Sequence, residues 1–327
     1  MTTVMQQGVR SRHFCVVDLL ISGPAVSLKQ VEAVIPVRMI GSIVPTMKKI
    51  LVPVDFSDNS KHALRVGAAI AVKYGALLEV IHVNTAIAYA PAMPEYPGLG
   101  SFDMTEYYDT VADEFRQLKK ELDADAALAG LQIETRVEEG LLYSSLRRIA
   151  EEDEIGLIVM GTKGASGALE FFVGSNTEKV IRTAPCPVLA IPEKSGDFNP
   201  KTVVLATTLD EDQFAAFLQL AGWQKRWPFN VKMLYLNNPG LFGSDKEIED
   251  AAPGFARRSG LHNVTKYGSG ATFNEEASIV QFAQKEGADL IVMATHQRKG
   301  LSHLLFGSLT EDTANHSPIP VLSIPVK

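Results

Sequence analysis

Residues 156–178 have the sequence GLIVMGTKGASGALEFFVGSNTE, which sets the class of fold expected for the whole chain. An apolar run at 156–160 leads into three spaced glycines, Gly161, Gly164 and Gly174, and a capping-box pattern closes the segment at Ser175–Glu178. The predicted order is a buried strand, a glycine-spaced loop and a helix N-terminus. This arrangement favours phosphate, because glycines let backbone N–H groups approach an anion and the helix end adds partial positive charge. A plain helix start would explain the capping pattern without a ligand, so the glycines carry the prediction.

Composition limits the classes of protein to consider. The chain has 327 residues, which is long for one domain and suits two. Its hydrophobic fraction of 46% is enough for sizeable cores, and its net charge of −7, without a long basic run, argues against nucleic acid as a partner. Two cysteines imply no disulfide framework, and no apolar run approaches the ~18–20 residues of a membrane helix. We therefore expect a cytoplasmic protein that does not associate with membranes.

Strand and helix patterns alternate from Lys48 onward. Strands are expected at Ile50–Val54, Leu77–Val83, Leu131–Val137, Leu157–Met160, Val188–Ile191, Thr202–Thr207, Asn230–Leu236, His262–Lys266, Leu290–Met293 and Val321–Ile324. Helices are expected at Asp58–Tyr74, Thr105–Ala129, Leu141–Glu151, Ser175–Arg182, Glu211–Trp223, Asp245–Arg258, Asn274–Glu286 and Ser308–Ala314. This alternation predicts an α/β fold with a parallel, doubly wound sheet.

An internal repeat predicts the domain organisation. The segments Leu157–Met160 and Pro187–Pro192 recur 133 residues later. The first strands of the two copies are separated by 153 residues. We predict a first domain at 47–194 and a second at 195–327, joined near Glu193–Pro200. Residues 1–46 show neither helical nor strand period and are expected to be an extension, disordered or upstream of a true start at Met47. A docked strand around 14–20 is the alternative.

Three segments together resemble the universal stress protein family: the glycine spacing at 161–175, the opening ILVPVD of Ile50–Asp55, and VIRTAPCPVL at Val180–Leu189. The resemblance covers Lys48–Lys327 as a tandem pair. It implies that each domain is Rossmann-like, of the adenine nucleotide α-hydrolase-like kind, with a five-stranded parallel sheet in the order 3-2-1-4-5 and helices on both faces. Family members dimerise through the last strand, so the last strands of the two copies should meet as an intramolecular pseudo-dimer. A further homodimer stays open.

The resemblance also implies an ATP site in the first domain, with Mg²⁺ left open. Asp55 and the backbone near Val83 would meet adenine, and Gly140 would lie near the ribose. The phosphates would be held by Gly161, Gly164, Gly174, Ser175 and Asn176. These positions fall at strand C-termini or helix N-termini, where open α/β sheets bind ligands. The alternatives are a turn capped by Asp55 and a plain helix entry at Gly140.

The second copy serves as an internal control. It keeps a glycine, Gly307, and the capping-box pattern at Ser308–Glu311. The other site positions differ: Ala294, Gln297 and Thr208 stand where the first copy has Gly161, Gly164 and Asp55. We therefore predict a degenerate second site that does not hold ATP as the first does. A positive patch at His296, Arg298 and Lys299 leaves weak binding of another anion as an alternative.

Other chemistries find little support. There is no P-loop, dinucleotide or nucleophile-elbow motif, the histidines lack metal-ligand spacing, and Cys186 between two prolines is expected to be buried. The leading hypothesis is an ATP-binding stress sensor or regulator without catalytic residues, at most slow in hydrolysis or autophosphorylation. The rival is a scaffold that binds no nucleotide and acts on an unknown protein partner. An enzyme of the wider α-hydrolase group would need a reactive residue that the sequence does not reveal. Ordinary packing is expected for the aromatic residues of the long loop and the helix after it, with cover for the site or contact with a partner as the alternatives: Tyr89, Tyr96, Phe102, Tyr107 and Tyr108.

Overall fold

A computed structural model of the chain describes residues 47–85, 104–162, 176–193, 195–236, 245–270, 275–296 and 304–326; for 245–250, 266–270, 296 and 304–308 it describes the backbone alone. The first half contains β1 (Lys49–Pro53), α4 (Asp58–Tyr74), β2 (Leu77–Asn84), α6 (Met104–Asp123), η3 (Ala126–Leu128), β3 (Ile133–Glu139), α7 (Leu142–Glu152), β4 (Leu157–Gly161), α8 (Asn176–Thr183) and β5 (Val188–Ile191). The second half contains β6 (Thr202–Thr207), η4 (Glu211–Gln213), α9 (Phe214–Gln224), β7 (Asn230–Leu236), α10 (Asp245–Ser259), β8 (Val264–Gly270), α11 (Glu275–Lys285), β9 (Leu290–His296), α12 (Leu304–His316) and β10 (Val321–Val326).

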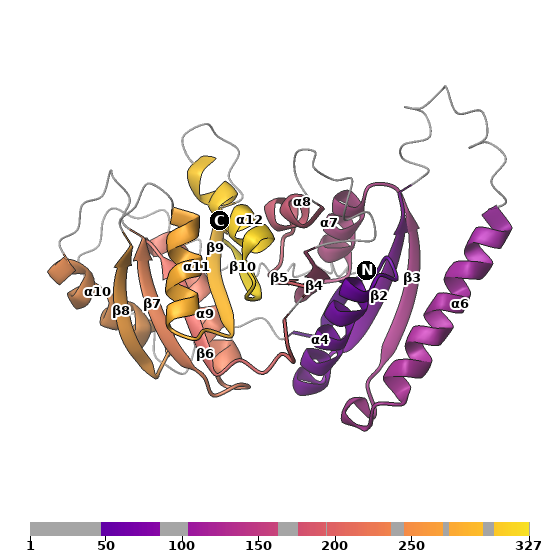
Figure 1. The fold of residues 1–327 in the computed structure, drawn as a ribbon, viewed down its shortest axis with the longest axis horizontal. Coiled ribbons are helices and arrows are strands. Elements are labelled where there is room, and N and C mark those ends of the chain that lie inside the picture. The colour runs from indigo at the N-terminus through magenta and orange to yellow at the C-terminus, as the bar shows by residue number, and fades with distance from the viewer. Residues whose placement is uncertain are drawn as a thin grey trace, which may run out of the picture. The chain divides into compact units, whose positions relative to one another are not determined.

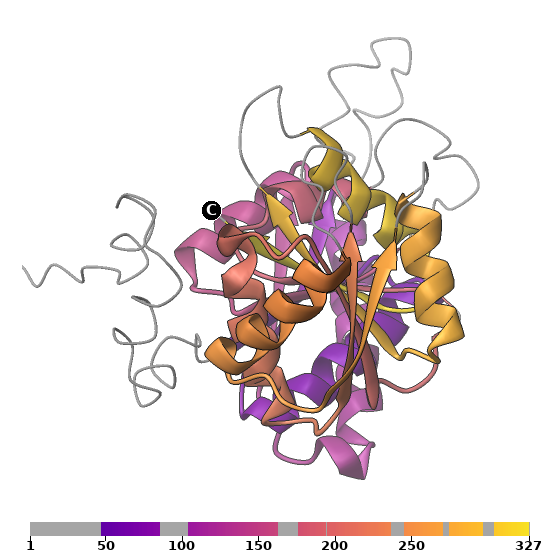
Figure 2. The same cartoon turned by 90° about the vertical axis from the view of Figure 1, so that its left-hand side faces the viewer.

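All the described strands belong to one 10-stranded sheet in the order β3-β2-β1-β4-β5-β10-β9-β6-β7-β8 (Figure 1). Within each half every pairing is parallel. Counted from its own first strand, each half has the order 3-2-1-4-5, which confirms the predicted topology. Parallel strands need crossover connections, and the crossover helices cover both faces of the sheet (Figure 2).

The two faces of the sheet bury two separate apolar layers. One contains α4, α6, α9 and α10, through residues such as Ile70, Phe115 and Phe217. The other contains α7, α8, α11 and α12, through residues such as Ile149 and Val180. Because strands are covered on both sides, their sequences are continuous apolar runs, which is how the sequence revealed them.

The halves meet at their last strands, as predicted. β5 pairs antiparallel with β10, with Leu189 opposite Leu322. Beside this pair, α8 lies against α12, where Arg182 Nε donates to Glu311 Oε1 at 3.0 Å. Asn315 of α12 donates in turn to Glu178 of α8. At the repeat offset of 133 residues, Arg182 matches Asn315 and Glu178 matches Glu311. Each helix therefore uses the same two positions in the contact, which is close to self-complementary.

Several predicted boundaries differ from the structure, and in four cases a side-chain contact explains the difference. The helix expected to run to Ala129 ends at Asp123, because Asp125 accepts from the Ala127 N–H at 2.9 Å and caps the separate turn η3. The helix expected from Glu211 is divided, because the Gln213 side chain turns to the end of β6. β8 begins later than expected, because His262 is held by the Gln224 side chain instead of a neighbouring strand.

The fourth error concerns the second capping box. Helix α12 begins at Leu304, so Ser308 lies inside it and is not its N-cap. Glu311, expected to reach back to the helix start, is 3% exposed and pairs with Arg182 of the other half. The Glu311 carboxylate, which the local pattern predicts to cap the helix, instead forms a tertiary ion pair with Arg182.

Candidate functional site

The described members of the predicted site lie at one edge of the sheet. Asp55 follows β1, Val83 is near the end of β2, Gly140 follows β3 and Gly161 ends β4. β1 pairs with β2 on one side and β4 on the other, so these strand ends are neighbours. Asn176 is the first residue of α8 and is exposed. Gly164, Gly174 and Ser175 lie outside the described residues.

The carboxylate of Asp55 organises a tight turn. Its Oδ1 accepts from the Ser57 N–H at 3.1 Å and from the Ser57 hydroxyl at 2.6 Å. Ser57 is the N-cap of α4, and Ser60 Oγ accepts from the Asp55 N–H at 3.3 Å. The turn-capping alternative for Asp55 is therefore present in the structure. Asp55 is nevertheless exposed, so its carboxylate is accessible from solvent.

Gly161 is a point of close approach between β4 and α4. A Cβ at this position would lie 2.6 Å from Asn59 Nδ2 and 2.9 Å from Asn59 Cγ. Asn59 is only 6% exposed, and Thr177 donates to the Gly161 carbonyl at 3.2 Å. Asn59 and Thr177 were missed by the sequence reasoning; the available signal was a polar residue in the first turn of a helix whose neighbours are buried. A side chain at 161 would displace Asn59, whether or not a ligand also requires the glycine.

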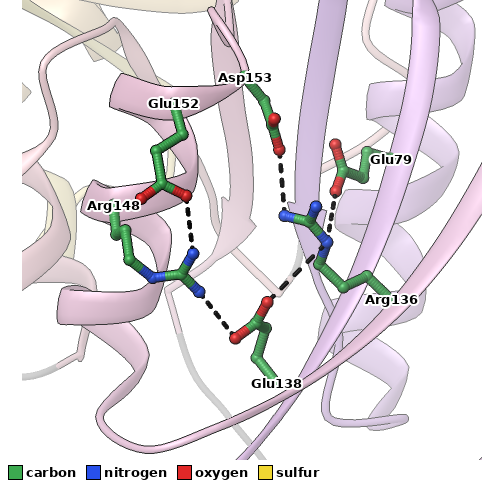
Figure 3. Close-up of polar contacts among 6 residues, drawn as sticks. All are labelled: Glu79, Arg136, Glu138, Arg148, Glu152 and Asp153. Carbon is green, nitrogen blue, oxygen red and sulfur yellow. Dashed lines mark hydrogen bonds and ion pairs between the residues drawn. The ribbon is translucent and has the colours of Figure 1, made fainter.

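Gly140 lies in a turn that is braced by charges. Its φ of 127° is in the region that favours glycine, and its N–H donates to the Asn84 carbonyl at 3.1 Å. Figure 3 shows the ion pairs that join β2 and β3, the strand before this turn, to α7 and the residue after it. The network consists of Glu79, Arg136, Glu138, Arg148, Glu152 and Asp153. It fixes the strand before Gly140 to the helix after it.

Arg136 is the centre of that network. Its Nε lies 3.2 Å from Glu79 Oε1, and its Nη1 lies 3.1 Å from Asp153 Oδ2. The Glu79 side chain is 4% exposed, and burial raises the pKa of its carboxyl while Arg136 opposes the shift. Arg136 is thus the cation that compensates a buried carboxylate in the layer between sheet and α7.

The second half repeats the turn but reverses its chemistry. Thr208 matches Asp55, and its hydroxyl donates to Asp210 Oδ2 at 2.6 Å. The hydrogen bond across the turn is kept while donor and acceptor have exchanged places. Gln213 accepts from the Thr208 N–H at 3.1 Å, the role that Ser60 has in the first half. The turn itself therefore does not require an acid at the Asp55 position.

Further groups bear on the chemistry of the chain. Cys186 is buried, as expected, and burial raises the pKa of its thiol to about 12, so it is a neutral thiol at neutral pH. Among the described residues no group of three or more His, Cys, Asp or Glu side chains is arranged to hold a metal. No helix in the described ranges is long and apolar enough to cross a membrane.

The fold defines a doubly wound α/β protein, and an exposed carboxylate, that of Asp55, lies just after one of its strands at the edge where such sheets bind ligands. The model of the universal stress protein family matches residues 46–192 and 262–325, more than half of the chain, and the chain belongs to that family. A universal stress protein of Methanocaldococcus jannaschii is 31% identical over 144 residues, covering 44% of this chain and 81% of the relative. One of Thermus aquaticus is 33% identical over 150 residues, covering 44% of this chain and 98% of the relative. A solved universal stress protein from Archaeoglobus fulgidus matches the fold with a TM-score of 0.63 at 20% identity, over 86% of this chain and 97% of its own.

Proposed function

We propose that the chain is a cytoplasmic stress-response sensor or regulator that binds ATP in a first domain at 47–194. In this proposal Asp55 accepts a hydrogen bond from the adenine amino group, and the backbone near Val83 completes recognition of the base. Gly140 lies by the ribose. The phosphates, with any accompanying Mg²⁺, are held by Gly161, Gly164, Gly174, Ser175 and Asn176. The second domain, 195–327, serves as a pseudo-dimer partner with a degenerate site.

One observation supports the proposal most. The turn after the first strand forms in both halves. In the first half its carboxylate is that of Asp55, which is exposed. In the second half it is that of Asp210, and the buried Thr208 stands at the Asp55 position. Since either arrangement closes the turn, local stability does not explain this choice. A ligand with an amino group at that edge does, because an ionised carboxylate only accepts hydrogen bonds.

The test begins with protein purified under native conditions. Nucleotide released by denaturation is identified by mass spectrometry, and nucleotide-free protein is titrated with ATP by calorimetry, with and without Mg²⁺. Asp55→Asn keeps an oxygen for Ser57 but offers a donor to adenine, so ATP affinity should fall by roughly tenfold. Thr208→Val is the matched control in the second half and should leave affinity unchanged. Protein that carries no nucleotide and binds none would refute the proposal.

A scaffold that binds no nucleotide is the second candidate. Two contacts favour it: Asp55 is engaged by Ser57, and the absence of a side chain at Gly161 is explained by Asn59. Gly164→Val separates the two functions. An ATP-binding protein should lose nucleotide and keep its fold, whereas a scaffold should keep binding its protein partner and show no change in nucleotide content.

A further inference from the structure

His82 contacts both chain neighbours of Asp55. Its Nδ1 lies 2.8 Å from the Val54 carbonyl oxygen, immediately before Asp55. Its ring stacks on Phe56, immediately after Asp55, with a centroid separation of 4.9 Å and an interplanar angle of 26°. Phe56 has a φ of 64°, a left-handed conformation that a bulky residue adopts only where its surroundings hold it. The imidazole is therefore part of what holds the Asp55 turn in shape.

The tautomer of His82 follows from its two partners. A carbonyl oxygen only accepts, so the proton must be on Nδ1. In the neutral ring Nε2 is then an acceptor, and the Tyr107 hydroxyl lies 2.8 Å from it. Burial raises the pKa of Tyr107, so its hydroxyl keeps the proton it donates. A directed chain of hydrogen bonds thus runs from Tyr107 on α6, through His82 on β2, to the backbone beside Asp55.

The second half lacks the carboxylate and the imidazole together. Leu209 has a φ of 59° and matches Phe56, so the left-handed turn is kept. Thr208 stands at the Asp55 position and Tyr235 at the His82 position. The turn can thus form without a histidine, and the histidine accompanies the acid.

We infer that His82, oriented by Tyr107, is a positioning residue that holds Asp55 for selection of adenine over bases with a carbonyl at the same ring position. This inference rests on the proposed ATP site. A carboxylate accepts from the adenine amino group and repels a carbonyl oxygen, so selectivity depends on where the carboxylate points. A turn that moves would lose this discrimination before it loses the phosphate contacts.

The first experiment needs no nucleotide. Imidazole ¹H–¹⁵N correlation spectra of the full chain, with the His82 signal assigned from its absence in His82→Asn, report the tautomer directly. The expected result is a proton on Nδ1 in the wild type and a mixture of tautomers in Tyr107→Phe. A wild-type His82 protonated on Nε2 alone would overturn the hydrogen-bond chain whatever the protein binds.

The second experiment compares ATP with inosine triphosphate, which differs at the amino position, and with tripolyphosphate. The selectivity ratio is the affinity for ATP divided by the affinity for inosine triphosphate. In His82→Leu this ratio should fall by roughly tenfold, while the affinity for tripolyphosphate should not change. His82→Asn, whose amide places a donor near the position of Nδ1, should retain most of the ratio, which separates positioning from bulk packing. ATP binding with equal selectivity in all variants overturns the inference alone. Failure of the wild type to bind any nucleotide overturns the proposed function and the selectivity claim, while the tautomer result stands separately.

Discussion

The first and second halves share a backbone plan but differ where a ligand would bind. In both, a threonine of the helix after the fourth strand donates to a carbonyl of that strand at the matching position, Thr177 to Gly161 at 3.2 Å and Thr310 to Ala294 at 3.4 Å. The fold therefore needs the threonine in each half. It does not need a glycine at that position of the strand, because the second half accommodates Ala294 there.

The same comparison applies to charges inside the two halves. Glu79 of β2 is compensated by Arg136, which also binds Asp153 after α7. At the matching positions the second half has a direct pair, with Lys232 Nζ 3.8 Å from Glu286 Oε2. Both halves tie the second strand to the helix behind it, but the first needs a third residue because both of its ends are acidic. The same ion pairs also stabilise the turn at Gly140, because they join the strand before it to the helix after it.

Replacing the bridging cation should have the largest effect on stability. Arg136→Met leaves Glu79 buried without its cation, and the free energy of unfolding should fall by about 3 kcal/mol, at the lower end for a broken buried pair because Arg136 is itself 35% exposed. Removing Arg136 raises the pKa of Glu79 further. The loss should therefore be greatest at neutral pH and shrink as pH falls and the carboxyl is protonated.

Chemical denaturation of Arg136→Met at pH 7 and pH 5 measures that effect. Lys232→Met is the matched change in the second half and should cost less, since its pair is longer. Glu79→Gln combined with Arg136→Met should recover most of the stability. Equal losses at both pH values would contradict the assignment of Glu79 as the uncompensated group.

Giving the first half the alanine of the second should have the next largest effect. Gly161→Ala forces a Cβ against Asn59 at 2.6 Å, and overpacking of this kind costs about 2 kcal/mol. Displacement of Asn59 should also weaken ATP binding by roughly tenfold or more, because it shifts the strand end beside the proposed phosphate site. Thermal unfolding and calorimetry measure the two losses.

Ala294→Gly is the control for that change. It removes a side chain that the second half accommodates and should cost about 1 kcal/mol or less, without changing nucleotide affinity. Gly161→Ala combined with Asn59→Ala should restore part of the stability by removing the clash. A Gly161→Ala variant as stable as the wild type would show that the close approach is not a constraint.

The contact between the halves should give a smaller effect. Arg182→Met removes the partner of Glu311, whose side chain is 4% exposed, but Arg182 is 62% exposed, so water screens the pair and the loss should be about 1 kcal/mol. Glu311→Gln, which keeps hydrogen-bonding capacity without the charge, should be milder. Urea unfolding measures the free energy of unfolding of both variants. A Glu311→Gln variant that is less stable than Arg182→Met would argue against the ion pair as the main contribution of this contact to stability.

Completing the symmetry of that contact should stabilise the chain slightly. Arg182 faces Glu311, but the matching position that faces Glu178 is Asn315. Asn315→Arg would supply the second ion pair, with an expected gain of about 0.5 kcal/mol that declines at high salt. Denaturation at low and high ionic strength measures both. A gain that does not depend on salt would not be electrostatic.

Much of this fold is local in origin, which is why the sequence predicted it. Buried strands such as Leu157–Gly161 are continuous apolar runs, and helix starts such as Ser57 carry their own caps. Some boundary errors arose where a distant side chain competed, as Gln224 does for the backbone of His262, and others where a nearby side chain formed a cap, as Asp125 does for η3. The candidate site was predicted through a family resemblance and not through contacts, so Asn59 and His82 were missed.

The sequence by itself determined the order of strands and helices, the family, and the positions that differ between the halves, because periodicity, caps and motifs are written within short segments. Only the tertiary structure decided which groups meet across the chain. In the folded protein Glu311 pairs with Arg182 and does not cap a helix, and Asn59 packs against Gly161. Hydrogen bonds also connect Tyr107, through His82, to the backbone of the Asp55 turn. These contacts join residues far apart in sequence, so no local pattern encodes them. In the stretch around Gly161, the close approach of Asn59 explains why residue 161 has no side chain. The binding of a phosphate by this glycine is the part of the proposal that experiment must test.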